Sequence, residues 1–143
     1  MENRFRCDCP ITSALDVVGD KWTLVLVKQM LLEGKRTFKD FAESEEAIAT
    51  NILSSRLKML EEFRVIQKRK LPGNQKTNIY TLTDKGLGLT PLIVELVLWS
   101  DGNLREFHPK ITPTSEPIVE DKEGAIRLFI DNYRESNRLD EQS

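Results

Sequence analysis

Cysteine and histidine are scarce in this sequence. Only two cysteines, Cys7 and Cys9, and one histidine, His108, occur among 143 residues. A bridge between cysteines one residue apart would be strained and would join no distant segments, so a disulfide framework is excluded. As a zinc site the pair lacks two further ligands, and structural zinc would need ligands shared between chains. We therefore expect neither a metal nor a cofactor.

Long apolar runs and a signal peptide are also missing. The charge-free stretch Gly86–Val94 is far shorter than the roughly 18 apolar residues of a membrane span. Arg4 and Arg6 are followed at once by residues 7–9, which include an aspartate, and not by the apolar region of a secretory signal. With 39% hydrophobic and 31% charged residues, the composition predicts a globular protein. We expect it to be cytoplasmic, with no membrane partner.

Sequence signatures of catalysis are absent as well. The chain has no glycine-rich phosphate loop and no cluster of metal ligands, and its single histidine lies outside any triad spacing. The sequence therefore does not predict an enzyme.

Acidic residues exceed basic residues by two, but the excess lies at the C-terminal end. From Thr114 onward there are eight acidic and four basic residues, whereas residues 1–113 carry a net charge of +2. The segment Arg64–Asn78 contains no acidic residue and five basic residues: Arg64, Lys68, Arg69, Lys70 and Lys76. The overall charge thus conceals one strongly basic segment that could meet nucleic acid.

The N-terminal part of the chain predicts helices. Thr12 or Ser13 can cap a short helix that Gly19 ends. Residues 22–32 are apolar nearly all round. A strand is possible there, but the length and the closing Gly34 favour a buried helix.

Two further helices follow closely. Thr37 can cap a short one with Phe38 and Phe41 inside. The next helix has apolar residues at helical spacing: Leu53, Leu57 and Leu60, with Ile52, Met59 and Phe63 beside them.

The opposite face of this helix carries four short polar side chains and one lysine: Thr50, Asn51, Ser54, Ser55 and Lys58. Serine, threonine and asparagine are mediocre helix formers, so an ordinary solvated face would favour other residues. Short hydrogen-bonding side chains suit a helix that enters the DNA major groove. An ordinary polar face with a few weak helix formers is the alternative.

A hairpin with a basic tip comes next. Residues 65–70 and 78–82 predict two strands, and Pro72-Gly73-Asn74 predicts the turn. Three helices followed by a hairpin give the order of a winged helix-turn-helix, in which the third helix reads bases and the wing meets phosphates. The alternative for the basic residues is a solvated strand edge protected by lysines.

The remaining chain predicts more helix. Thr83 can cap a helix in which Leu89, Leu92, Ile93 and Leu96 face a core and Pro91 kinks or restarts it. Residues 108–117 contain three prolines and read as an extended linker. The final helix carries an apolar stripe, which must dock on this chain or on a partner: Ile126, Phe129, Ile130 and Tyr133. We assign residues 1–108 to the DNA-binding domain with its dimerisation helices, and residues 109–143 to the linker and acidic helix.

Several motifs resemble the HxlR-type winged helix regulators of bacteria and archaea. The matching segments, in order, are Cys9-Pro10, Gly19-Asp20-Lys21-Trp22-Thr23, Arg36-Thr37-Phe38 with Phe41, Ile48–Lys58, Tyr80–Gly86 and Trp99. Together they run from about Cys7 to His108. As a set they are highly specific, although no single motif would be.

The resemblance implies a mainly α protein with a small β-hairpin wing, similar in shape to MarR-type regulators, which binds double-stranded DNA as a homodimer. It places Thr50, Asn51, Ser54, Ser55 and Lys58 in the groove. It implies that Arg36 and Lys39 lie near the DNA backbone. From the basic segment and its turn we assign the DNA contacts of the wing to Lys68, Lys70, Asn74, Gln75 and Lys76. Terminal helices would form the dimer, and we assign to it Leu15, Leu92, Leu96 and Trp99. Arg56 could make an internal salt bridge or contact a phosphate.

Cys9 matches a cysteine that looks like a sensor of oxidants or electrophiles in some members of that family. Sensing requires a thiolate, which Arg4, Arg6 or the start of the first helix could favour. An oxidised Cys9 could form a disulfide with the same cysteine of the partner subunit or with Cys7. Either bond could shift the spacing of the two helices that contact the bases. The alternative is a small cysteine without a signalling role. A winged-helix module that binds protein through its acidic tail is the alternative to DNA binding.

Overall fold

The first helix, α1 (Pro10–Val18), begins earlier than the sequence predicts. The computed structural model describes residues 4–142, with side chains as far as Arg138. Cys9 is the N-cap residue of α1 and Pro10 is its first residue, so the prediction that Thr12 or Ser13 caps it is wrong. Proline is favoured at this position because its φ is preset and its missing N–H has no helical partner. Gly19 ends the helix, as predicted.

The second helix, α2 (Thr23–Glu33), confirms the buried helix predicted for the apolar run. Leu26, Val27 and Met30 are fully buried. Gly34 follows in the left-handed conformation, with φ 69°, which glycine adopts without steric cost.

Helices α3 (Phe38–Ala42) and α4 (Thr50–Glu62) follow. Phe41 is buried, but Phe38 is 36% exposed, so the prediction that both lie inside is wrong. A helix of five residues has little more than one turn to bury, and Phe38 stands at its first position. Leu53, Leu57 and Leu60 of α4 are buried as predicted. Each contributes about 2 kcal/mol of hydrophobic stabilisation.

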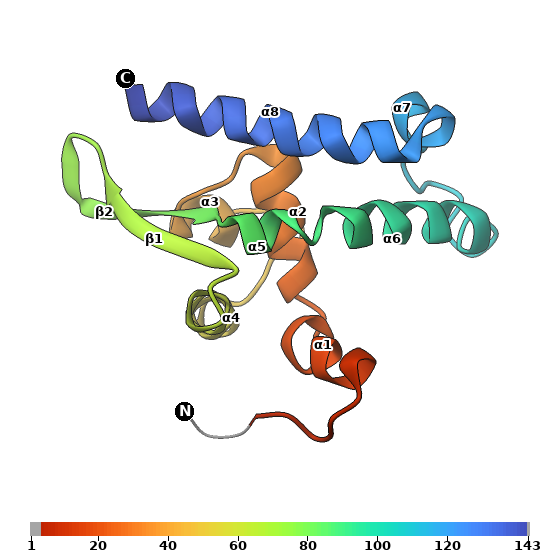
Figure 1. Ribbon diagram of the computed structural model, residues 1–143, viewed down its shortest axis with the longest axis horizontal. Helices are drawn as coiled ribbons and strands as arrows, with labels where there is room; N and C mark the ends of the chain where they lie inside the picture. Colours follow the sequence, from red (N-terminus) through yellow and green to blue (C-terminus); the bar gives the residue numbers. More distant parts are fainter. Residues whose placement is uncertain (1–3, 143) are drawn as a thin grey trace. The chain divides into compact units, whose positions relative to one another are not determined.

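Strands β1 (Ile66–Leu71) and β2 (Asn74–Leu82) form the predicted antiparallel hairpin (Figure 1). The strand β2 begins at Asn74 and not at Asn78, so the hairpin is longer than predicted. Thr83 then caps α5 (Asp84–Leu87), as predicted, by accepting a hydrogen bond from the Gly86 amide at 3.2 Å.

The chain forms two compact units, of which the first ends at Gly86 and the second begins at Leu87. The second unit contains α6 (Thr90–Asn103), α7 (Glu116–Glu120) and α8 (Lys122–Gln142). Pro91 lies in the first turn of α6, so it restarts the helix. The core of this unit combines residues of all three helices: Val94, Val97, Leu98, Ile118, Ala125, Ile126, Phe129 and Ile130. The final helix therefore docks on its own chain, one of the two predicted alternatives.

Two residues expected in the core are outside it. Leu92 is 39% exposed and Leu96 is 44% exposed, so the prediction that both face the chain's own core is wrong. The apolar residues of α6 are distributed over all sides of the helix. Within the described residues, the side that carries Ile93 and Val94 is the buried one. The predicted extended linker is also shorter than expected, because Pro117 lies within α7.

None of the helices within residues 4–142 combines the length and the apolar character that a membrane span requires. The same part of the chain shows no group of three or more side chains arranged to hold a metal ion.

Candidate nucleic-acid interface

The exposed face of α4 is the centre of the candidate interface. All five polar residues predicted to read bases are exposed on this helix: Thr50, Asn51, Ser54, Ser55 and Lys58. The buried leucines on the opposite side fix which face is presented. The N-cap residue Ala49 has no polar side chain and makes no side-chain hydrogen bond to the first turn of the helix.

The turn between α3 and α4 is tied to α2 by Glu46, a contact that sequence reasoning missed. Its carboxylate accepts a hydrogen bond from Gln29 Nε2 at 2.8 Å and pairs with Lys28. The Lys28 ammonium, followed by Gln29, holds the pKa of Glu46 below its usual value. Ala47 adopts φ 57° in the same turn. A glutamine in the middle of an apolar helix, here fully buried, was the available signal, because a buried amide requires a partner.

The beginning of α3 is fixed by a capping box. The Thr37 hydroxyl accepts a hydrogen bond from the Asp40 amide, and the Asp40 carboxylate accepts one from the Thr37 amide, both at 3.1 Å. The amide of Arg36 also donates to this carboxylate, at 3.1 Å. Burial alone would raise the pKa of Asp40, but these donors and Lys35 lower it below its usual value. The cap predicted at Thr37 is confirmed and is stronger than a single hydrogen bond.

Arg56, for which two roles were open, lies near a carboxylate within its own chain. Its Nη1 atom is 3.8 Å from Asp20 Oδ1. Asp20 also accepts hydrogen bonds from the amides of Trp22 and Thr23 at the start of α2, at 3.0 and 3.1 Å. Burial would raise the pKa of Asp20, but the Thr23 hydroxyl, these amides and Arg56 outweigh it and lower it. Asp20 therefore links the beginning of α2 to the middle of α4.

The hairpin presents the basic residues predicted for the wing. Lys68, Lys70 and Lys76 are exposed, and so are Asn74 and Gln75. Pro72 and Gly73 form the turn, where Gly73 has φ 80°. Regular pairing ends after Lys70↔Asn78 and resumes at Leu71↔Asn74, so residues 75–77 bulge from the strand. The bulge places Gln75 and Lys76 directly beside the turn of the wing.

Two residues are predicted to contact the DNA backbone: Arg36, which lies just before α3, and Lys39, which lies in its first turn. Lys39 is exposed and Arg36 is half-buried. The Arg36 carbonyl accepts a hydrogen bond from the Tyr80 amide of β2 at 2.7 Å. This contact joins the segment before α3 to the wing strand. An open groove of about 550 Å³ lies beside α4, with Ser54, Lys58 and Lys68 in its lining.

Both cysteines are free and exposed. Cys9 stands at the start of α1, as its N-cap residue. The Thr12 amide, followed by the Thr12 hydroxyl and the Ile11 amide, lowers the pKa of the Cys9 thiol. Three groups were proposed to favour the thiolate: Arg4, Arg6 and the start of α1. The start of α1 is therefore the one that lowers the pKa. The arginines are engaged elsewhere, since Arg4 pairs with Glu62 and Arg6 pairs with Asp16.

The four residues predicted to form the dimer are all exposed. In the first unit, Leu15 of α1 is 52% exposed. In the second unit, Leu92, Leu96 and Trp99 follow at spacings of four and three along α6, and Trp99 is 59% exposed. These three residues form an apolar stripe on the part of α6 that α8 does not cover.

Comparisons with known proteins agree with this geometry. Residues 17–108 match the family model described as HxlR-like helix-turn-helix. The chain is 33% identical over 94 residues to the HTH-type transcriptional regulator YodB of Bacillus subtilis (strain 168), covering 65% of this chain and 83% of YodB. The reduced form of YodB matches with a TM-score of 0.55 at 32% identity, over 68% of this chain and 95% of that one. The redox regulator HypR in its oxidized form matches with a TM-score of 0.59 at 28% identity, over 66% and 97% of the two chains.

Proposed function

Because this chain belongs to the HxlR-like helix-turn-helix family of transcriptional regulators, we propose that it binds double-stranded DNA sequence-specifically as a homodimer, in response to thiol-reactive compounds. Membership in this family confirms the predicted winged-helix regulator and the expectation that the chain is not an enzyme. A regulator of this kind acts on the chromosome, so we place it in the cytoplasm.

The exposed polar face of α4 carries the proposal. Thr50, Asn51, Ser54 and Ser55 present hydroxyl and amide groups that can hydrogen-bond to base edges in the major groove. The wing lysines present charge that suits phosphates and carries no sequence information of its own. One helix therefore supplies specificity, and the hairpin supplies affinity.

The apolar stripe of α6 supports the homodimer. Leucine and tryptophan side chains exposed together are typical of a surface that is buried in an oligomer. A homodimer would present two α4 helices to two related half-sites, about 34 Å apart along one face of the duplex.

The position of Cys9 supports the response to thiol-reactive compounds. Its exposed sulfur and lowered pKa favour the thiolate, which is the nucleophilic form. YodB has been solved in quinone-bound and diamide-treated forms, and HypR is described as a redox regulator. We therefore assign to Cys9, with Cys7 beside it, the detection of an oxidant or electrophile.

Fluorescence anisotropy with DNA from upstream of the protein's own gene tests this proposal. Affinity should fall steeply with salt, by about 0.9 logarithmic units per tenfold increase in salt for each phosphate neutralised. Asn51→Ala should cost about 1–3 kcal/mol on the preferred site and little on other DNA, whereas Lys70→Ala should weaken all DNA about equally. Diamide should change the affinity of the wild type and leave the affinity of Cys9→Ser unchanged. Absence of salt-dependent binding would refute DNA binding, and an unchanged affinity in diamide would refute only the thiol response.

A further inference from the structure

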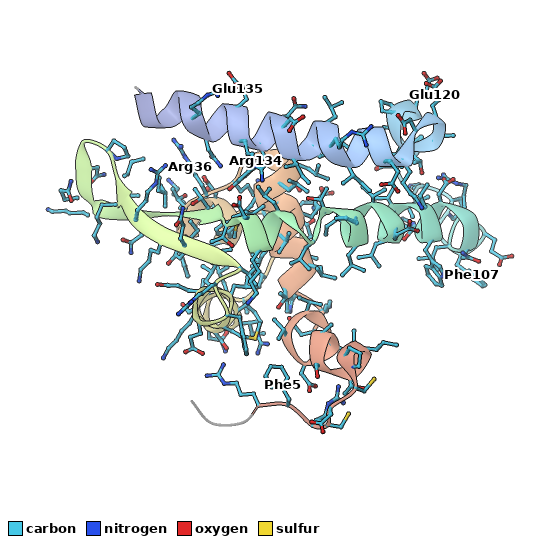
Figure 2. The ribbon with its side chains drawn as sticks, viewed as in Figure 1. Phe5, Arg36, Phe107, Glu120, Arg134 and Glu135 are labelled. Carbon is cyan, nitrogen blue, oxygen red and sulfur yellow. The ribbon has the colours of Figure 1, made fainter. Side chains whose placement is uncertain are left out.

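The N-terminal arm, residues 4–9, reaches the C-terminal end of α4. Arg4 Nη2 lies 2.6 Å from Glu62 Oε2, in the last turn of that helix. The Arg4 guanidinium also lies over the Phe63 ring, 5.6 Å from its centroid. The Phe5 ring, labelled in Figure 2, meets the Phe63 ring edge to face at a centroid distance of 6.0 Å. The arm therefore contacts the last helical residue of α4 and the residue that caps it.

The following part of the arm is fixed to α1. The Arg6 amide donates to Asp16 Oδ2 at 3.1 Å, and Arg6 Nε lies 2.5 Å from Asp16 Oδ1. The Ser13 hydroxyl donates to the Cys7 carbonyl at 3.4 Å, and the Ser13 amide donates to the Cys9 carbonyl at 2.9 Å. Both cysteines consequently belong to a short segment that spans from α1 to α4.

The arm also borders the base-reading face. A cavity of about 420 Å³ is lined by Arg4 together with Ser55, Lys58 and Glu62 of α4. The match to the family model begins at residue 17, so that model does not cover the arm. A shift of the arm by a few ångströms would alter both the end of α4 and the surface beside Ser55.

We propose that Arg4 and Phe5 are positioning residues for α4, and that through them modification of the neighbouring thiols changes how α4 meets DNA. This inference rests on the proposed function, because it names a route for the thiol response within one chain. Bulk added at Cys7 or Cys9 displaces the arm, the contacts with Glu62 and Phe63 are lost, and α4 loses its support at that end. The ion pair is partly exposed and contributes little to stability, so variants that lack it should fold.

The test measures DNA affinity before and after alkylation with N-ethylmaleimide. The thiolate sulfur adds to the maleimide double bond and the adjacent carbon takes up a proton, so no oxidant is required. Mass spectrometry establishes that each variant carries the adduct. Alkylation of the wild type should lower affinity about tenfold. Arg4→Gln and Glu62→Gln should each weaken binding without alkylation and should show a further change of less than about twofold on alkylation.

Glu61→Gln is the matched control. Glu61 precedes Glu62 on α4, but its nearby partner is Lys68, at 3.9 Å, and not the arm. This variant should retain the full response to alkylation. The direction of the Glu62→Gln effect separates positioning from direct contact: if Arg4 itself bound a phosphate, removal of the Glu62 charge would strengthen DNA binding.

Stronger binding by Glu62→Gln, or a full alkylation response in Arg4→Gln, would overturn the inference. So would a wild type that binds DNA but does not respond to N-ethylmaleimide, and DNA binding would then still stand. A wild type that binds no DNA would instead refute the proposed function itself.

Discussion

Arg64 adopts a backbone conformation that side-chain-bearing residues rarely use, with φ 62°. It follows the C-cap residue Phe63 of α4. The Arg64 amide donates to the Glu61 carbonyl at 3.0 Å, and the Val65 amide donates to the Leu60 carbonyl at 2.9 Å. This pair of bonds is the Schellman motif, usually completed by glycine. The buried pair Leu60 and Val65 accompanies it and holds the arginine in the left-handed region.

Replacing Arg64 with Gly should raise the free energy of unfolding by about 1 kcal/mol, because the left-handed conformation costs other residues about that much. Arg64→Val should lower it, since a β-branched side chain resists positive φ more strongly. Urea denaturation at neutral pH checks both values. Equal stability of the glycine and valine variants would show that the strain is absent in solution.

At the scale of elements, α4 is placed by contacts at both of its ends and at its middle. Glu46 ties the preceding turn to α2, Asp20 links α2 to Arg56, and the arm meets Glu62. The capping box fixes α3 in the same way. The orientation of α4 thus depends on polar contacts as well as on its buried leucines.

The Asp40 cap should give α3 a stability that depends on pH. The pKa of Asp40 is lower in the folded chain than its usual value of 3.8, so the charged form is favoured by folding. The contribution of the ionised Asp40 to the free energy of unfolding is complete above the unfolded-state pKa. It is lost as the pH falls through the folded-state pKa. Asp40→Ala should cost about 1 kcal/mol at pH 7 and less at pH 3.

Urea denaturation at the two pH values gives the measurement for Asp40. Asp40→Asn keeps an acceptor oxygen but cannot ionise, so its destabilisation relative to the wild type should also shrink at pH 3. An Asp40→Ala penalty that is the same at both pH values would contradict this assignment.

At the scale of the whole molecule, α6 has two apolar faces with different uses. One face packs with α7 and α8 through Val94, Val97 and Leu98. The other face exposes Leu92, Leu96 and Trp99. The described part of the chain covers the first face, and we propose that the second face meets the partner subunit.

Trp99→Glu should convert the proposed dimer into a monomer, because a carboxylate would be buried in the interface without a partner. Sedimentation velocity measures the change directly. Leu128→Glu is the control, since Leu128 is exposed on α8 outside the stripe and its replacement should leave the dimer intact. A Trp99→Glu protein that sediments as the wild type does would contradict the proposed interface.

The sequence alone determined the local elements and the face that α4 exposes. Helical spacing of leucines, the cap at Thr37 and the turn at Gly73 depend on neighbouring residues, so they can be recognised without tertiary contacts. Helix starts were less certain: the sequence pointed to Thr12 or Ser13, whereas the chain uses Cys9 and Pro10.

Only the tertiary structure decided which partner each buried or charged group takes. Residues far apart in sequence supply the contacts of Gln29 with Glu46, of Asp20 with Arg56 and of Arg4 with Glu62. It also decided that Leu92 and Leu96 stay outside the core, because apolar spacing shows that a helix can be buried but not which side its neighbours cover. Periodicity is a property of the chain, whereas burial depends on how distant segments pack.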